Sequence, residues 1–107
     1  MDVTYYLTDE NESVTHVLTC WNNAIAQPHE TKYVVTFDIT RTHKFNIKHI
    51  IQMTGFIARR KRVIKEQTEK IVIILRSKEQ ERMIKTGLSI IPSFVPFEII
   101  RQNISLN

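Results

Sequence analysis

KIVIILR, residues 70–76, is the stretch that decides the fold of this 107-residue chain. Its five central residues, Ile71 to Leu75, are all aliphatic, and charged residues stand on both sides of them. Short apolar runs of this kind are typical of strands in parallel sheets that helices cover on both faces. We therefore predict a buried strand at the centre of a parallel sheet.

Three further segments predict strands. Lys32 to Thr40 (KYVVTFDIT) is nearly apolar on both faces from Tyr33 to Phe37, which again indicates a strand covered by helices on each side. Val3 to Thr8 (VTYYLT) combines β-branched and aromatic residues, and Phe97 to Arg101 (FEIIR) is a short apolar segment. These compositions favour strands at both positions.

Between the first two strands, apolar residues recur with the spacing of one helical face: Val14, Val17, Leu18, Trp21 and Ile25. Asp9, with Glu12 three residues later, matches a capping box, in which side chains bind the free amides of the first helical turn. A first helix is predicted from about Glu10 to Gln27.

Two more helices follow the same logic. Behind Asn46, the expected N-cap, one long second helix is predicted from about residue 47 to 67. Its apolar stripe consists of Ile47, Ile50, Ile51, Thr54, Ile57, Ala58 and Ile64. A third helix begins after Ser77, which forms a Ser-x-x-Gln box with Gln80, and ends before Pro92.

The resulting order, βαβαβαβ, is typical of an α/β fold with right-handed crossovers. We expect a sandwich of two or three layers, with a mostly parallel four-stranded sheet and three helices. No internal repeat, low-complexity segment or linker divides the chain, so residues 1–107 are predicted to form a single domain.

Composition and charge narrow the function classes. The chain is 42% hydrophobic and 24% charged, as in globular proteins, and its net charge of +4 favours an anionic partner without choosing between nucleic acid and acidic proteins. The longest apolar run is far shorter than the roughly 20 residues that a spanning helix needs. Because no signal peptide is recognisable either, we expect a cytoplasmic protein without membrane contact, or one of the host cytoplasm if its source is a virus.

The join of the second strand to the second helix, FDITRTHKFNIKHI (residues 37–50), resembles the STAS and Sec14-like family of small α/β domains. In that family a hydrophobic strand ends in Asp and is followed by a short loop, an apolar residue and a polar helix start. The resemblance covers most of the chain by element order, including KIVIILRSK and the closing PFEII. It implies a STAS-like fold.

Bacterial STAS proteins of the anti-sigma-factor antagonist type are similar in layout, and they dock a partner protein around the start of this helix. A serine phosphorylated by the partner kinase lies there, typically in an Asp-Ser-Ser-Gly sequence. This chain instead has Asn46, Ile47, Lys48 and His49, without a hydroxyl. The resemblance therefore implies partner docking without a serine switch. The sequence looks closer to the free-standing Sec14/STAS-like chains of bacteria and large DNA viruses than to the switch proteins.

Ligands of open parallel sheets bind outside the carboxyl ends of the strands, where helix N-termini also point. A basic rim is predicted there, and the residues proposed to bind a partner protein are Arg41, His43, Lys44, Asn46, Lys48, Arg76 and Lys78. Solvated loop charges are the alternative interpretation. Asp38 is interpreted as a turn acceptor rather than a general base, because no catalytic partner is identifiable in the sequence.

The densest positive charge lies in the predicted second helix. Its candidate nucleic-acid-binding residues are Arg59, Arg60, Arg62 and Lys65, of which Arg59, Arg62 and Lys65 nearly share one helical face. A solvated basic helix end is the other interpretation of this run, and no aromatic residues interleave with it as they do in RNA-binding signatures.

No catalytic, cofactor or metal site is predicted. His16 and Cys20 are four residues apart on the first helix, but zinc takes three or four ligands and no CxxC or HxxxH set accompanies this pair. Our leading hypothesis is a non-enzymatic protein-interaction or regulatory module that docks a partner at the rim and the start of the second helix. The partner is a different protein or a second copy of the chain, and nucleic-acid binding through the basic run is the alternative function.

Overall fold

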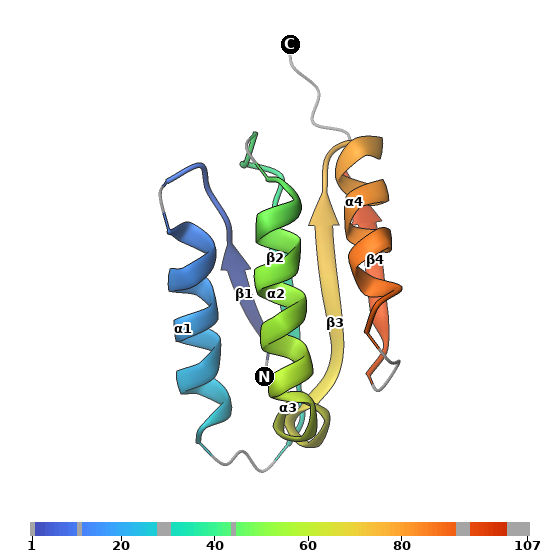
Figure 1. Cartoon of the computed structure of the whole chain (residues 1–107). Helices are drawn as coiled ribbons and strands as arrows, with labels where there is room; N and C mark the ends of the chain where they lie inside the picture. The colour runs from blue at the N-terminus through green and yellow to red at the C-terminus, as the bar shows by residue number, and fades with distance from the viewer. Residues whose placement is uncertain (1, 11, 28–30, 44, 92–94, 103–107) are drawn as a thin grey trace.

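In the computed structural model, which describes residues 2–10, 12–27, 31–43, 45–91 and 95–102, the chain forms four strands and four helices (Figure 1). The elements in chain order are β1 (Asp2–Tyr6), α1 (Ser13–Ile25), β2 (Tyr33–Asp38), α2 (Ile47–Arg59), α3 (Lys61–Gln67), β3 (Thr68–Leu75), α4 (Lys78–Leu88) and β4 (Phe97–Arg101).

The strands form one sheet in the order β1-β2-β3-β4, and every neighbouring pair is parallel. Each crossover steps in the same direction across the sheet. Because such crossovers are right-handed, they bring all the helices to one face, as Figure 1 shows. The predicted α/β fold with a parallel four-stranded sheet is confirmed, and it has two layers.

The prediction that helices cover the central strands on both faces is wrong. In β2, Tyr33, Val35 and Phe37 are buried, whereas the alternate residues Val34 and Thr36 are only partly buried. None of the described helices lies on the second face of the sheet (Figure 1). The apolar residues on both faces of the strand therefore predicted helices on two faces, whereas the described helices cover one.

On this second face, which we call the uncovered face, neighbouring strands shield one another. Val72 of β3 lies in register between Thr36 of β2 and Glu98 of β4, and it is only 7% exposed. Lys70 Nζ lies 2.9 Å from Glu98 Oε2, and this hydrogen bond and ion pair raise the pKa of Lys70. Val72 is thus shielded by its neighbours, whereas Tyr6 and Ile100 of the two edge strands stay exposed on this face, at 50% and 38%.

The predicted long second helix is also corrected, because it is interrupted at Arg60. There the backbone has φ −110° and ψ 16°, so α2 ends at Arg59 and α3 starts at Lys61. Ile64 of α3 is fully buried after this bend. Burying Ile64 against the core favours the turn over one straight helix, and the described chain has four helices rather than three.

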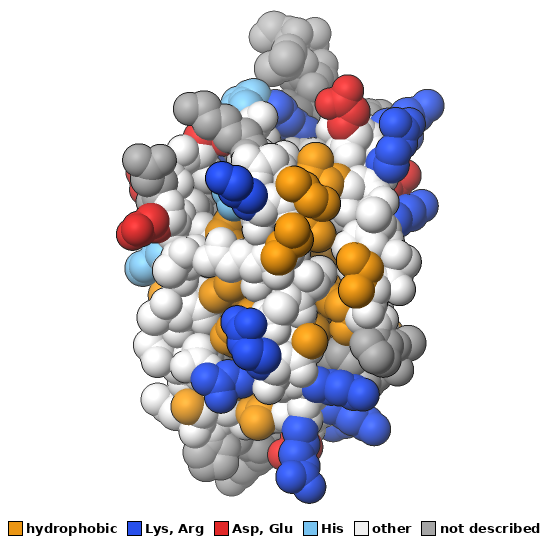
Figure 2. Space-filling model, viewed as in Figure 1, with side chains coloured by type: hydrophobic (Ala, Val, Ile, Leu, Met, Phe, Trp, Pro, Cys, Tyr) orange, Lys and Arg blue, Asp and Glu red, His pale blue; other side chains and the backbone are white. Residues whose placement is uncertain are grey.

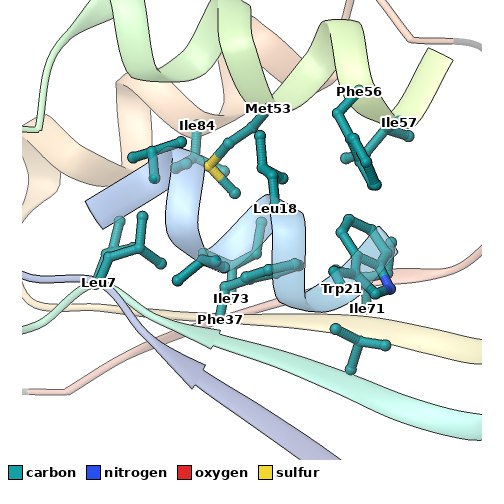
Figure 3. Close-up of a cluster of buried hydrophobic side chains, with 14 of the residues drawn as sticks. Leu7, Leu18, Trp21, Phe37, Met53, Phe56, Ile57, Ile71, Ile73 and Ile84 are labelled. Carbon is teal, nitrogen blue, oxygen red and sulfur yellow. The ribbon is translucent and has the colours of Figure 1, made fainter. Parts of the chain in front are cut away.

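Aromatic packing holds α1 and α2 onto the sheet. Trp21 of α1 is fully buried, with its ring 5.0 Å from that of Phe37 in β2 and 5.2 Å from that of Phe56 in α2. Figure 3 shows Trp21 between Phe56 and the sheet. Tyr5 of β1 stacks on Phe37 at 5.8 Å, and burial raises the pKa of Tyr5 to about 12. The core is therefore centred on β2.

The close approach of α2 and α4 predicts the effect of a glycine substitution. A Cβ at Gly87 would overlap Cγ2 of Ile50 and lie 3.4 Å from Cγ2 of Thr54. We expect Gly87→Ala to lower the free energy of unfolding by about 1–3 kcal/mol, because overpacking forces the helices apart. Urea unfolding measures this change.

Gly55→Ala is the matched control, since Gly55 also lies within a helix. Its Cβ would meet only the flexible end of Arg59, with Nη1 at 3.2 Å. We expect unchanged stability or a gain of up to about 1 kcal/mol from helix propensity. Equal losses in both variants would contradict the close helix contact at Gly87.

Candidate functional site

Loops from three strands meet at the carboxyl edge of the sheet, because parallel strands all end there. The loop after β1 carries Asp9, the loop after β2 carries Thr42 and His43, and β3 leads directly into Arg76. We call these four residues the rim network.

Hydrogen bonds join the members of the rim network. Asp9 Oδ1 accepts from Thr42 Oγ1 at 2.8 Å and from the backbone N–H of His43 at 2.7 Å. Asp9 Oδ2 lies 3.0 Å from His43 Nδ1, and His43 Nε2 lies 3.1 Å from Arg76 Nη1. A guanidinium only donates, so Nε2 accepts and Nδ1 carries the proton of a neutral ring. Both ring nitrogens of His43 are therefore bonded within the network.

The predicted capping role of Asp9 is wrong, and so is the predicted start of the first helix at Glu10. The helix α1 begins at Ser13, after Glu12, whose backbone is left-handed with φ 66°. Ser13 Oγ accepts from the backbone N–H of Thr8 at 3.0 Å. Because the chain turns before α1 starts, the side chain of Asp9 reaches the loop after β2.

Gln80 of α4 connects the rim network to the fold. Its Oε1 accepts from the backbone N–H of Arg76 at 2.9 Å, and its Nε2 donates to the carbonyl oxygens of Ile39 and Thr42, both at 3.2 Å. Its backbone N–H donates to Ser77 Oγ, which confirms Ser77 as the N-cap. The sequence indicated Gln80 only as a capping residue. Its position one helical turn before the inward-facing Ile84 could have indicated a buried amide that binds the backbone of neighbouring loops.

Asp38 ends β2 as a turn acceptor, as predicted. Its Oδ1 accepts from the backbone N–H of Thr40 at 2.9 Å and from Thr40 Oγ1 at 2.6 Å. Beyond this turn, Arg41 Cζ lies 5.0 Å from the ring centroid of Tyr6 in β1. Arg41 therefore lies at the β1 side of the edge, over an exposed aromatic ring.

The start of α2 is held by a capping box. Asn46 Oδ1 accepts from the backbone N–H of Lys48 at 2.9 Å, and His49 Nδ1 accepts from the backbone N–H of Asn46 at 3.0 Å. The ring of His49 also stacks on the buried Phe45, at a centroid distance of 5.3 Å. Asn46 is confirmed as the N-cap, so its side chain is used within the fold.

Two isoleucines of α2 face solvent although the sequence placed them in the inward stripe. Ile47 is 55% exposed and Ile51 is 63% exposed. Their spacing of four residues puts them on one face of the helix, with the exposed Lys48 beside them. Figure 2 shows hydrophobic side chains gathered on the helix layer around α2 and its border with α4. We call Ile47, Lys48 and Ile51 the α2 surface.

A cleft of about 390 Å³ separates the start of α1 from the start of α2. Glu10 and Glu12 line it on the α1 side, and Lys48 and His49 line it on the α2 side. Gln52 Nε2 donates to Thr15 Oγ1 at 2.7 Å and so ties the two helices together. The cleft thus brings side chains of opposite charge next to the α2 surface.

The residues predicted to bind a partner fall into separate groups. His43 and Arg76 are joined in the rim network, and Asn46 and Lys48 line the cleft. Lys78 lines a groove along α4, Arg41 lies over Tyr6, and Lys44 is outside the described residues. The predicted rim is therefore several adjoining surfaces, and its binding role remains a prediction.

The candidate nucleic-acid-binding residues, Arg59, Arg60, Arg62 and Lys65, are all exposed at the turn from α2 to α3. Figure 2 shows basic side chains near the α3 end of the molecule. The bend at Arg60 separates Arg59 from the face that Arg62 and Lys65 occupy on α3. The expected single basic face is therefore divided between two helices.

Metal-binding clusters and membrane-spanning helices are absent from the described part of the chain. No group of three or more His, Cys, Asp or Glu residues there is arranged to hold a metal ion. His16 Nε2 lies 3.8 Å from Cys20 Sγ on α1. Within the same residues, no helix has the length and hydrophobicity needed to span a membrane.

Comparisons of the chain with protein-family models, curated proteins and solved structures found no match. The resemblance to STAS and Sec14-like domains is therefore still a prediction.

The contacts of Gln80 predict a stability effect. We expect Gln80→Met to lower the free energy of unfolding by about 1–3 kcal/mol, because the Arg76 amide and two carbonyl oxygens lose their partner. Chemical denaturation measures the loss, and hydrogen exchange should show faster exchange of the Arg76 amide. Gln102→Met, at an exposed position, is the control, and an equal effect there would refute this account.

Proposed function

We propose that this chain is a non-enzymatic interaction module that docks a partner protein on the α2 surface and the adjoining rim network. The observation that carries the proposal is the exposure of Ile47 and Ile51 on the first two turns of a firmly capped helix. Adjacent exposed apolar side chains with polar residues around them are typical of protein contacts.

The α2 surface has the properties of a small interface centre. Full burial of an isoleucine contributes about 1.5–3 kcal/mol, so covering the exposed parts of Ile47 and Ile51 is worth about 2 kcal/mol in total. The capping box holds Lys48 and its neighbours in place before binding. A pre-organised helix loses little conformational entropy when it binds.

Lys48 of the α2 surface favours a partner that carries a carboxylate there, whereas Glu10 and Glu12 across the cleft favour a basic partner residue on their side. Lys48 lies beside the two isoleucines, and Arg76 lies in the rim network. An amphipathic partner segment with an apolar stripe, a carboxylate next to Lys48 and a basic residue next to Glu10 and Glu12 matches this arrangement. The family resemblance points to the same place, because STAS proteins of the anti-sigma-factor antagonist type dock partners around the corresponding helix start.

The proposal is non-enzymatic because the titratable residues at the rim are bonded to one another. Asp9 accepts from Thr42 and His43, and the remaining ring nitrogen of His43 accepts from Arg76. A general base needs a free acceptor directed at the substrate. This arrangement supports a structural role for His43 in holding the loop after β2.

Substitution of both isoleucines tests the proposal. We expect Ile47→Ser/Ile51→Ser to lose about thirtyfold in affinity for the partner, which corresponds to about 2 kcal/mol of buried apolar contact. The partner would be captured from an extract of the source organism by the wild-type chain and identified by mass spectrometry. Biolayer interferometry with the purified partner then gives the affinities.

Ile90→Ser is the matched control. Ile90 is also exposed, at 74%, but it lies beyond the C-terminal end of α4 and outside the α2 surface. It should bind as the wild type does. Capture that is equal for the wild type and the double variant would refute the proposal. Light scattering tests the second copy as partner, since a dimer that the double variant converts to monomers would identify it.

A further inference from the structure

A shallow groove of about 630 Å³ runs along α4 to the end of β4. Four cations line it, Lys78, Arg82, Lys85 and Arg101, together with the carboxylate of Glu81. We call it the α4 groove. Basic residues from a helix and from the edge strand meet in a hollow here, although Arg101 is far from the others in the sequence.

The cations are regularly placed along the groove. Lys78, Arg82 and Lys85 recur after four and three residues, which puts them on one side of α4. At 1.5 Å per residue they span about 10 Å of the helix axis. Phosphates of one strand of a duplex advance about 3.4 Å each along the duplex axis, so this row of cations extends over about three of them.

The groove has a clear excess of positive charge. Among the described lining residues, Glu81 is the one acidic residue, and its Oε2 lies 3.7 Å from Lys85 Nζ. Four cations and one carboxylate leave a net charge of +3 in the lining, against +4 for the whole chain. Concave surfaces with one dominant sign of charge concentrate the electrostatic potential.

The other lining residues favour backbone contacts over base recognition. Thr86 Oγ1 donates to the carbonyl oxygen of Arg82 at 2.9 Å, and Ser89 Oγ donates to that of Thr86 at 2.6 Å. Their donor hydrogens are therefore used within the helix. Among the described lining residues none is aromatic or apolar, so the groove has neither a stacking platform nor an anchor for an acidic protein.

We propose that the α4 groove binds the phosphate backbone of double-stranded nucleic acid without sequence preference. Contacts made only to phosphates carry affinity but no sequence information. A duplex is favoured over a single strand because its charge density is higher and no aromatic residue in the groove would stack on unpaired bases.

The α4 groove is better suited to this binding than the basic run at the turn from α2 to α3. The bend at Arg60 divides that run, and the guanidinium of Arg59 lies back against Gly55 of its own helix. Lys61 already has an interaction within the protein. By contrast, the four cations of the α4 groove line a single concave surface.

This inference is independent of the proposed partner docking. The groove lies along α4 and β4, whereas the α2 surface consists of Ile47, Lys48 and Ile51. Substitutions in one surface leave the residues of the other unchanged, so the two proposals fail separately.

The experiment measures binding of the full chain to a fluorescent 20-base-pair DNA duplex by anisotropy, between 20 and 200 mM KCl. With three to four phosphates neutralised, the logarithm of the affinity should fall against the logarithm of the salt concentration with a slope of about −3 to −4. For Arg82→Ala/Lys85→Ala the slope should shrink by about 2, and affinity at 50 mM KCl should fall at least about tenfold.

Arg59→Ala/Arg62→Ala is the matched control, because it removes the same charge from the basic run and should reduce affinity less than threefold. Circular dichroism and thermal unfolding show whether both variants are folded. A larger loss in the control variant, absent duplex binding, or equal competition by poly-glutamate at the same charge concentration would each overturn the proposal. A scrambled duplex sequence should bind equally well, and a sequence-dependent affinity would also contradict it.

Discussion

The parallel pairing of β2 with β3 is the constraint on which the rest of the structure depends. These are the two central strands, and Phe37 of β2 pairs with Ile73 of β3 in register. Trp21 packs edge-on against Phe37 and also contacts Phe56, so α1 and α2 are attached to the sheet at one place. Since every crossover has the same direction, α4 comes to the same face.

This topology leaves a parallel sheet with one face free of described helices, which is unusual because parallel sheets are normally covered on both faces. The side chains explain how it is tolerated. Thr36 and the Lys70–Glu98 pair interrupt the apolar surface, and Val72 is shielded between neighbouring strands. The apolar core therefore lies almost wholly between the sheet and the helices.

The same topology collects the loops at one edge and fixes them there. Gln80 of α4 binds the residues that follow β2 and β3, and Asp9 in the loop after β1 binds the loop after β2. These bonds make the edge a rigid platform from which the start of α2 projects. Pre-organised surfaces of this kind lose little conformational entropy on binding. The exposed isoleucines on α2 therefore support the proposed docking of a partner protein.

The linear pattern was sufficient for the four strands and for the N-caps Asn46 and Ser77, because these depend on local periodicity and short-range hydrogen bonds. The alternation of strands with helices then predicted the parallel sheet, although one helix was expected where the structure has α2 and α3. Only the tertiary structure decided that no described helix covers the second face of the sheet, that the helix bends at Arg60 and that Ile51 is exposed. Each of these three features depends on how the helices pack against the sheet and against one another. The rim network and the α4 groove likewise join residues distant in the chain, and no local pattern records such a contact.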